Sequence, residues 1–180
     1  MAETAAVPID RRLAREDAFA RLVSRELAGA YRAAAVLLGD EAEAEDATQD
    51  ALVRTWQRWD HLRDEDRAGA WFGRILVNVC RDRLRARRTV AVRRVPVLTS
   101  PDPQGDAGER EALWEALTGL SADHRIVIVL RYYLDLPLEV IAERTGAPLG
   151  TVKSRLHHAL GAVRAVYEAQ ERASEAEATP

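Results

Sequence analysis

The chain has 180 residues, a formal net charge of −3 at pH 7 and a hydrophobic content of 47%. This composition favours a soluble protein with a packed core and argues against disorder over the whole length. The single cysteine, Cys80, excludes an intramolecular disulfide and a metal site built from several cysteines. No apolar run approaches the ~20 residues of a membrane span, and the N-terminus lacks the apolar stretch of a signal peptide. We therefore expect a cytoplasmic protein without a membrane partner, a metal or another cofactor.

Apolar residues recur at helical spacing through the first half of the chain. The first expected helix covers about 13–38 and ends at Gly39, a residue that commonly terminates helices. A second helix continues to about residue 59. The charged stretch 60–67 is expected to be a loop, and a third helix follows over about 70–88.

The composition changes after the third expected helix. Residues 90–108 contain several prolines and glycines and have no helical period, which predicts a flexible linker. A second helical block covers 109–168, and the tail 169–180 is expected to fray. No strand-like alternation is present. The sequence thus predicts an all-α fold with two small helical domains, 12–89 and 109–168, joined by a flexible linker.

Charge is distributed unevenly along the chain. Residues 40–50 are acidic without a basic residue, whereas 74–94 are strongly basic and 144–164 contain basic residues but no acid. The acidic helix would repel DNA, so its polar face could instead meet a basic protein partner. A solvated helix with favourable acids in its first turn explains this segment equally well.

Residues 137–166 have the pattern of a helix-turn-helix motif, with a short helix, a turn at Gly146 and a second helix that begins near Pro148. In the second helix an apolar stripe should pack inward, and hydrogen-bond donors occupy the opposite side. A solvated face of a helical bundle is the alternative, which the absence of acids from 145 to 164 disfavours. The donors on the outer side are Lys153, Ser154, His157 and His158.

The two adjacent histidines do not predict a metal site. Neighbouring residues of a helix diverge by about 100°, so His157 and His158 would be a poor chelating pair.

The expected third helix has an apolar stripe and an opposite face of arginines with one asparagine. Such a face suits contacts to phosphates together with one base contact. Trp59 and Trp71 bracket the preceding loop and could stack on unpaired bases; alternatively, both belong to the core. The polar face comprises Arg74, Asn78, Arg81, Arg85 and Arg88.

Three segments, in this order, resemble the extracytoplasmic-function branch of the sigma-70 family. Residues 45–50, Glu-Asp-Ala-Thr-Gln-Asp, resemble the acidic motif of region 2, and residues 71–78 resemble its W-x-x-R-I-x-x-N helix. Residues 148–155 resemble P-x-G-T-V-K/R-S-R of region 4. The resemblance covers about 12–168. It implies a sigma factor that binds core RNA polymerase, directs promoter-specific initiation and assists promoter melting, and that is not an enzyme.

The resemblance also assigns roles to residues of this chain. The loop from His61 to Ala70 would border a pocket for a flipped base of the −10 element, with Asn78 in that pocket. Partners would be core polymerase, through its largest-subunit clamp and its flap, and promoter DNA; an anti-sigma factor is compatible with the family but not indicated by the sequence. The polymerase contacts would be Asp46, Gln49 and Asp50, the −10 contacts Trp71, Arg74, Asn78, Arg81 and Arg85, and the −35 contacts Lys153, Ser154, Arg155, His157 and His158.

The chain departs from the family pattern at several positions. His157 and His158 replace a frequent aromatic and arginine, so the −35 sequence cannot be transferred, and Gly73 stands where a larger residue is usual.

A stand-alone helix-turn-helix regulator would explain 137–166 equally well, but not the acidic helix followed by the arginine–asparagine helix. We expect Cys80 to be a buried thiol. The state of the free chain is left open, and a closed form with packed domains is compatible with the sequence.

Overall fold

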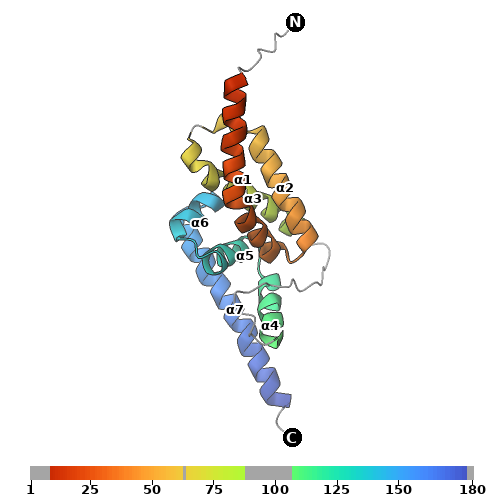
Figure 1. Cartoon of the computed structure of the whole chain (residues 1–180). Helices are drawn as coiled ribbons and strands as arrows, with labels where there is room; N and C mark the ends of the chain where they lie inside the picture. Colours follow the sequence, from red (N-terminus) through yellow and green to blue (C-terminus); the bar gives the residue numbers. More distant parts are fainter. Residues whose placement is uncertain (1–8, 63, 88–106, 178–180) are drawn as a thin grey trace.

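The computed structural model describes residues 9–62, 64–87 and 107–177, and each regular element in these ranges is helical (Figure 1). This confirms the all-α fold class. Short 3-10 turns occupy the stretch that was expected to be a loop, and the fifth helix continues into a π-helical turn. The long elements are α1 (Ile9–Leu38), α2 (Glu41–Gln57), α3 (Ala68–Ala86), α4 (Ala107–Gly119), α5 (Ala122–Ile128), α6 (Leu138–Thr145) and α7 (Leu149–Glu177), and the short turns are Trp59–His61, Glu65–Arg67 and Val129–Tyr133.

The turn between α1 and α2 is built from local hydrogen bonds. Gly39 has a φ of 68°, in the left-handed region that favours glycine, and its N–H donates to the Ala35 carbonyl over 2.8 Å. Asp40 then caps α2, because its carboxylate accepts from the Glu43 N–H at 2.9 Å. The predicted helix end at Gly39 is therefore confirmed.

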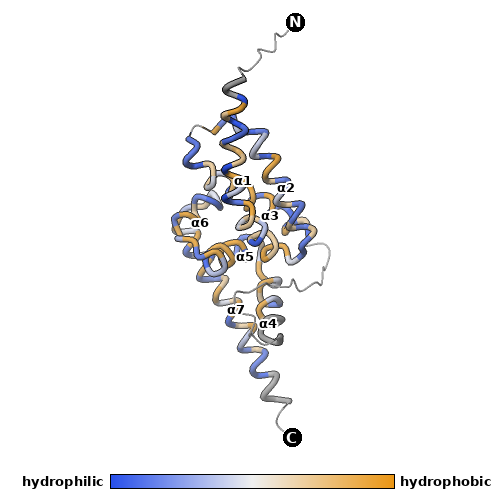
Figure 2. The backbone as a smooth tube through the Cα atoms, in the orientation of Figure 1, coloured by the Kyte–Doolittle hydropathy of each residue, from blue (hydrophilic) through white to orange (hydrophobic). Residues whose placement is uncertain are grey.

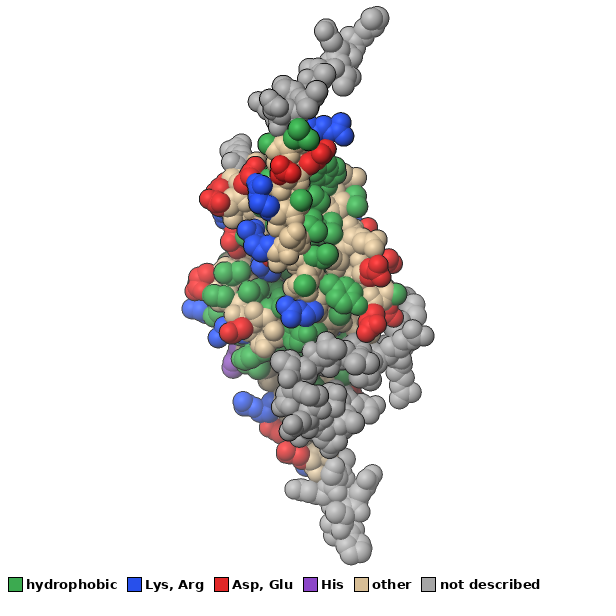
Figure 3. Space-filling view, in the orientation of Figure 1, with side chains coloured by type: hydrophobic (Ala, Val, Ile, Leu, Met, Phe, Trp, Pro, Cys, Tyr) green, Lys and Arg blue, Asp and Glu red, His purple; other side chains and the backbone are tan. Residues whose placement is uncertain are grey.

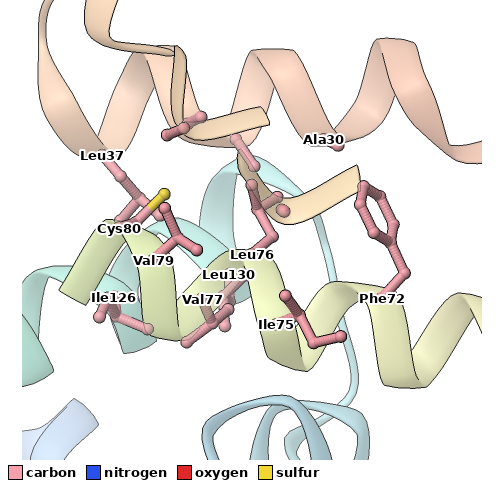
Figure 4. Close-up of a cluster of buried hydrophobic side chains, with 14 of the residues drawn as sticks. Ala30, Leu37, Phe72, Ile75, Leu76, Val77, Val79, Cys80, Ile126 and Leu130 are labelled. Atoms are coloured by element: carbon pink, nitrogen blue, oxygen red, sulfur yellow. The ribbon is translucent and has the colours of Figure 1, made fainter. Parts of the chain in front are cut away.

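Helices α1, α2 and α3 pack together as the first domain. Alanines on the inner face of α2 are fully buried, which allows the α1 and α2 backbones to approach closely. On α3, Leu76 and Cys80 point toward α1, whereas Val77 lies on the side of Ile126 and Leu130 of the second domain (Figure 4). Helix α3 is thus buried on two sides and forms the centre of the molecule.

The second domain packs directly against the first. Helices α5 and α6 lie between α3 and the upper part of α7 in Figure 1. Ile126, Val127, Leu130 and Ile141 belong to the same buried cluster as the core residues of α1 and α3. The segments with hydrophobic residues accordingly gather at the middle of the molecule in Figure 2. Helices α4 and α7 enclose a smaller separate cluster around Leu117. The two domains therefore share one core.

The C-terminal helix is longer than expected. Helix α7 continues to Glu177, whereas fraying was expected from residue 169. From 162 to 177 the sequence contains no glycine or proline and is rich in alanine, glutamate and arginine, which are strong helix formers. The expected linker, 90–108, falls outside the described residues except for its last two positions.

The buried position of Cys80 predicts an inert thiol. Burial raises the pKa of Cys80 to about 12, although the charge of Arg83 acts in the opposite direction. At pH 8 we expect iodoacetamide to modify the native chain roughly 1000-fold more slowly than the urea-unfolded chain, because the thiolate is the reactive species. Mass spectrometry of timed samples would measure both rates. Equal rates would contradict the burial of this side chain.

Candidate nucleic-acid interface

Buried apolar side chains on the facing sides of α6 and α7 hold the helix-turn-helix motif together. Ile141 and Val152 are fully buried, one from each helix. Gly146 ends α6 with a φ of 69°, a conformation that suits glycine at this position. Pro137 precedes α6 as its N-cap residue, and the Ile141 N–H donates to the Pro137 carbonyl over 3.0 Å. The turn therefore presents the N-terminal half of α7 at the surface.

The donors predicted for the outer side of α7 are exposed together. Lys153, Ser154, His157 and His158 all face solvent. His158 lies beside His124 of α5, with ring centroids 6.3 Å apart in a stacked arrangement. These four side chains form the α7 face.

Arg155 differs from its neighbours on α7. It is half-buried, and its guanidinium donates to the Asp123 carboxylate at 3.3 Å. The structure therefore does not bring Arg155 together with the exposed residues of the α7 face.

The polar side of α3 gathers four of the five residues that the sequence indicated, and the fifth, Arg88, lies outside the described residues. Arg81 donates to the side-chain oxygen of Asn78 over 2.6 Å, so the guanidinium group and the amide are held next to each other. Arg74 and Arg85 are exposed, whereas the Arg81 side chain keeps only 13% of its accessible surface. We call this surface, Arg74, Asn78, Arg81 and Arg85, the α3 face.

Asp123, in the first turn of α5, contacts both the α3 face and Arg155 of α7. Its carboxylate accepts from Arg81 at 2.8 Å, from Arg85 at 3.2 Å and from Arg155 at 3.3 Å. Burial raises the pKa of Asp123, but the charges of Arg155, Arg81 and Arg85 outweigh it and hold the pKa below the usual value. No local pattern indicates this role, since an acid two residues after a Ser N-cap is also expected of an ordinary helix start.

A surface cleft of about 340 Å³ lies beside the first turn of α3. Trp71, half-buried, lines it together with the loop that was expected to border a base pocket. Asn78 is not among its lining residues, so the structure separates these two parts of the expected pocket. Trp59 is instead a core residue, with 6% exposure and an edge-to-face contact with Phe19. The cleft is lined by His61, Leu62, Asp64, Arg67, Ala70, Trp71, Arg74 and Glu143.

Helix α2 carries an acidic region and lines an apolar groove on the surface of the first domain. Asp46 and Gln49 are exposed, and Asp50 is half-buried with its carboxylate 3.0 Å from Arg83. An apolar groove of about 470 Å³ lies between α1 and α2, and the α2 residues that line it follow the acidic region in the sequence. Figure 3 shows hydrophobic side chains along this part of the surface. The groove is lined by Glu16, Phe19, Ala20, Leu52, Val53, Trp56 and Gln57.

Two further properties concern only the part of the chain that the structure describes. Within it, no group of three or more His, Cys, Asp or Glu side chains could hold a metal ion. None of the described helices combines the length and apolarity needed to cross a membrane.

Comparison with known proteins gives two family matches in chain order. Residues 22–90 match the model of Sigma-70 region 2, and residues 110–163 match that of Sigma-70 region 4. RNA polymerase sigma-E factor of Streptomyces avermitilis is 35% identical over 142 residues, which cover 78% of this chain and 79% of the relative. ECF RNA polymerase sigma factor SigL of Mycobacterium tuberculosis is 38% identical over 144 residues, covering 74% of this chain and 80% of the relative.

Two solved structures have a similar fold. The sigma factor RpoE in complex with the anti-sigma factor NepR from Bartonella quintana aligns with a TM-score of 0.66 and 26% identity, over 83% of this chain and 96% of that one. CnrH in complex with the cytosolic domain of CnrY aligns with a TM-score of 0.63 and 26% identity, over 88% and 97% of the two chains.

Proposed function

The chain belongs to the extracytoplasmic-function branch of the sigma-70 family of RNA polymerase sigma factors, and we propose that its α3 and α7 faces read two separate promoter elements. The observation that carries this proposal is the presence, in one chain, of two donor-rich helical faces from different domains. A sigma factor directs initiation by the polymerase, so we assign no catalytic step to this chain. Its place of action would be the cytoplasm, on promoter DNA.

The α7 face is suited to the −35 element. Its side chains are donors on the N-terminal half of the second helix of a helix-turn-helix motif, the part that reaches base edges in the major groove. Lys153 can donate to guanine or phosphate oxygens, and Ser154 can donate or accept. Arg155 would join this face only after leaving Asp123.

The α3 face is suited to the −10 element. Its arginines can hold the phosphate backbone, while Asn78 offers an amide for one base. Trp71, at the adjacent cleft, provides an aromatic surface on which an unpaired base can stack, worth about 1–3 kcal/mol. Capture of an extruded base would offset the few kcal/mol of unstacking and so assist melting.

The acidic end of α2 is the proposed docking surface for core polymerase. Asp46, Gln49 and Asp50 would contact the clamp of the largest subunit, as the family resemblance implies. The apolar groove around Val53 and Trp56 lies farther along the same helix, Val53 being one turn after Gln49, and Val53 is 53% exposed. A partner with basic side chains beside an apolar ridge would satisfy both parts of this surface. The flap would receive the second domain.

An anti-sigma factor is a further proposed partner. The support is that two solved structures of similar fold are sigma–anti-sigma complexes or carry a bound cytosolic domain. A binding screen against proteins encoded beside this chain's own gene would identify such a partner.

Run-off transcription with purified core polymerase tests the proposed reading of the promoter. Templates would include the region upstream of this chain's own gene. We expect specific transcripts only when the chain is added, and about 5- to 150-fold fewer with Asn78→Ala or Lys153→Ala, since each removes a base-contacting group worth about 1–3 kcal/mol. Arg164→Ala, an exposed change farther along α7, is the matched control and should transcribe normally. If the chain shifts duplex DNA but never binds core, a stand-alone regulator replaces the proposal.

A further inference from the structure

A cavity of about 150 Å³ lies where α1 and α3 of the first domain meet the chain segment that follows α5. At this place Phe72 and Leu76 point from α3 toward α1 (Figure 4). An apolar space of this volume can hold one benzene ring. Apolar side chains from all three elements line the cavity, among them Ala33, Leu37, Phe72, Leu76 and Leu130.

The α1 side of the cavity is open because Gly29 has no side chain. Gly29 lines the cavity, and a Cβ atom placed on it would meet no other atom within 4 Å. Glycine inside a helix is unfavourable relative to alanine, so helix formation does not explain this residue in α1. A longer side chain at this position could enter the cavity without a clash at its Cβ atom.

The second domain contributes an irregular segment to the cavity wall. Leu130 belongs to the π-helical turn Val129–Tyr133, and Leu134 and Leu136 follow that turn. The Leu136 N–H donates to the Leu130 carbonyl over 3.0 Å, and Asp135 between the two later leucines has a φ of 48°. Turns of the π-helical type are rare and occur frequently at functional sites. The wall on this side is therefore formed where the regular helix stops.

A positively charged group at the cavity has an unused donor. Arg144 of α6 lines the cavity, and its guanidinium carbon would lie 2.9 Å from a Cβ atom placed on Gly73. Its Nε–H is buried and has no hydrogen-bond partner among the described residues. Glu26 also lines the cavity, but its carboxylate already accepts from the Arg25 Nε–H at 2.9 Å. A buried donor without an acceptor is unfavourable, and a carboxylate can accept from Nε and a terminal nitrogen of one guanidinium.

From these observations we propose that the cavity binds a small apolar monocarboxylate of about the size of phenylacetate. Its apolar group would occupy the space between Phe72 and Leu130, and its carboxylate would accept from the Arg144 guanidinium. The inference goes beyond promoter reading, because it assigns a small-molecule site and does not depend on the α3 or α7 face.

Fluorine NMR of para-fluorophenylacetate, titrated with the full chain, is the first test. We expect a Kd of about 1 mM or tighter, which is within the range of a ligand of this size. The neutral analogue para-fluorobenzyl alcohol should bind at least about tenfold more weakly, because it cannot form a charge-assisted hydrogen bond with Arg144. The absence of binding by the acid at about 10 mM would overturn the proposal.

Arg144→Gln tests the role of the guanidinium, with Arg164→Gln as its control. Arg164 is an exposed residue of α7 that does not line the cavity, so its replacement changes the net charge equally. We expect Arg144→Gln to bind the acid at least about tenfold more weakly and to lose the preference over the alcohol. Arg164→Gln should match the wild type within about twofold. Equal losses in the two variants would indicate a general charge effect and would overturn the assignment.

Gly29→Leu tests the cavity itself without changing any charge. Its side chain should fill the space, weaken binding of the acid at least about tenfold and raise the unfolding temperature, because leucine also favours a helix. Gly161→Leu makes the same replacement at an exposed position of α7 with equally free space and should bind normally. Circular dichroism would establish that each variant is folded. Unchanged binding by a folded Gly29→Leu would overturn the site, and if this variant fails to fold, the loss of preference in Arg144→Gln decides.

Discussion

Reversing the charge at Asp46 is expected to weaken assembly with core RNA polymerase by roughly 30-fold or more. Asp46 is exposed on α2 and would face a basic partner surface, so Asp46→Arg replaces an attractive pair by a repulsive one. Losing such an interfacial pair costs about 2–5 kcal/mol, which corresponds to roughly 30-fold to several 1000-fold in affinity. Titration of labelled chain with core polymerase by fluorescence anisotropy would measure this loss.

Glu41→Arg provides the matched control for that experiment. Glu41 is also an exposed acid of α2, but it lies five positions earlier and therefore points about 140° away from Asp46 around the helix. Its reversal should change the affinity for core by no more than about threefold. Equal losses in the two variants would indicate a general charge effect and would remove the acidic end of α2 as the docking surface.

Most helix positions could be predicted from local sequence signals. Gly39 ends α1 and Asp40 begins α2 because both make short-range hydrogen bonds that do not depend on the rest of the fold. The turn at Gly146 follows for the same reason. The extent of α7 was underestimated, because its position at the chain end predicted fraying, although every residue from 162 to 177 tolerates a helix.

The packing of the two domains could not be predicted, because helical periodicity shows which face is buried but not against which element. One signal was nevertheless present. The run from Ile126 to Leu130 consists of five apolar residues in succession, and a helix that is apolar on all sides must be buried on all sides. A small domain cannot bury such a helix alone, so α1 and α3 of the first domain complete its burial.

The exposed surfaces of the candidate site could be predicted from the sequence, but the ion pairs of Asp123 between its helices could not. The α3 and α7 faces follow from helical spacing alone. Asp123 does not, since its role depends on three arginines that are 32 to 42 positions away in the sequence. Of the two tryptophans, Trp59 belongs to the core and Trp71 to the cleft. Trp59 packs edge-to-face against Phe19 of α1, a contact that no local pattern predicts.

The largest loss of stability is expected from removal of a buried arginine between the domains. Arg125 is 8% exposed and donates to the Leu117 and Thr118 carbonyls at the end of α4, over 2.8 and 2.9 Å. It also donates to the Leu37 carbonyl at the end of α1, over 3.2 Å. Burial lowers the pKa of Arg125 to about 10, with a further contribution from the charge of Arg87. It therefore remains protonated at pH 7 and offers charged donors to two helix ends.

Arg125→Met should lower the free energy of unfolding by about 3–5 kcal/mol, because three buried carbonyls lose their donor at once. Urea unfolding followed by circular dichroism would measure the change. Arg131→Met is the control: its side chain is 39% exposed and donates to one carbonyl, that of Leu136, so about 1 kcal/mol is expected. Arg125→Lys keeps the charge but lacks the planar fork that reaches several acceptors, so it should recover only part of the loss. Full recovery by lysine would show that charge alone, not the bridging of α1 and α4, stabilises this junction.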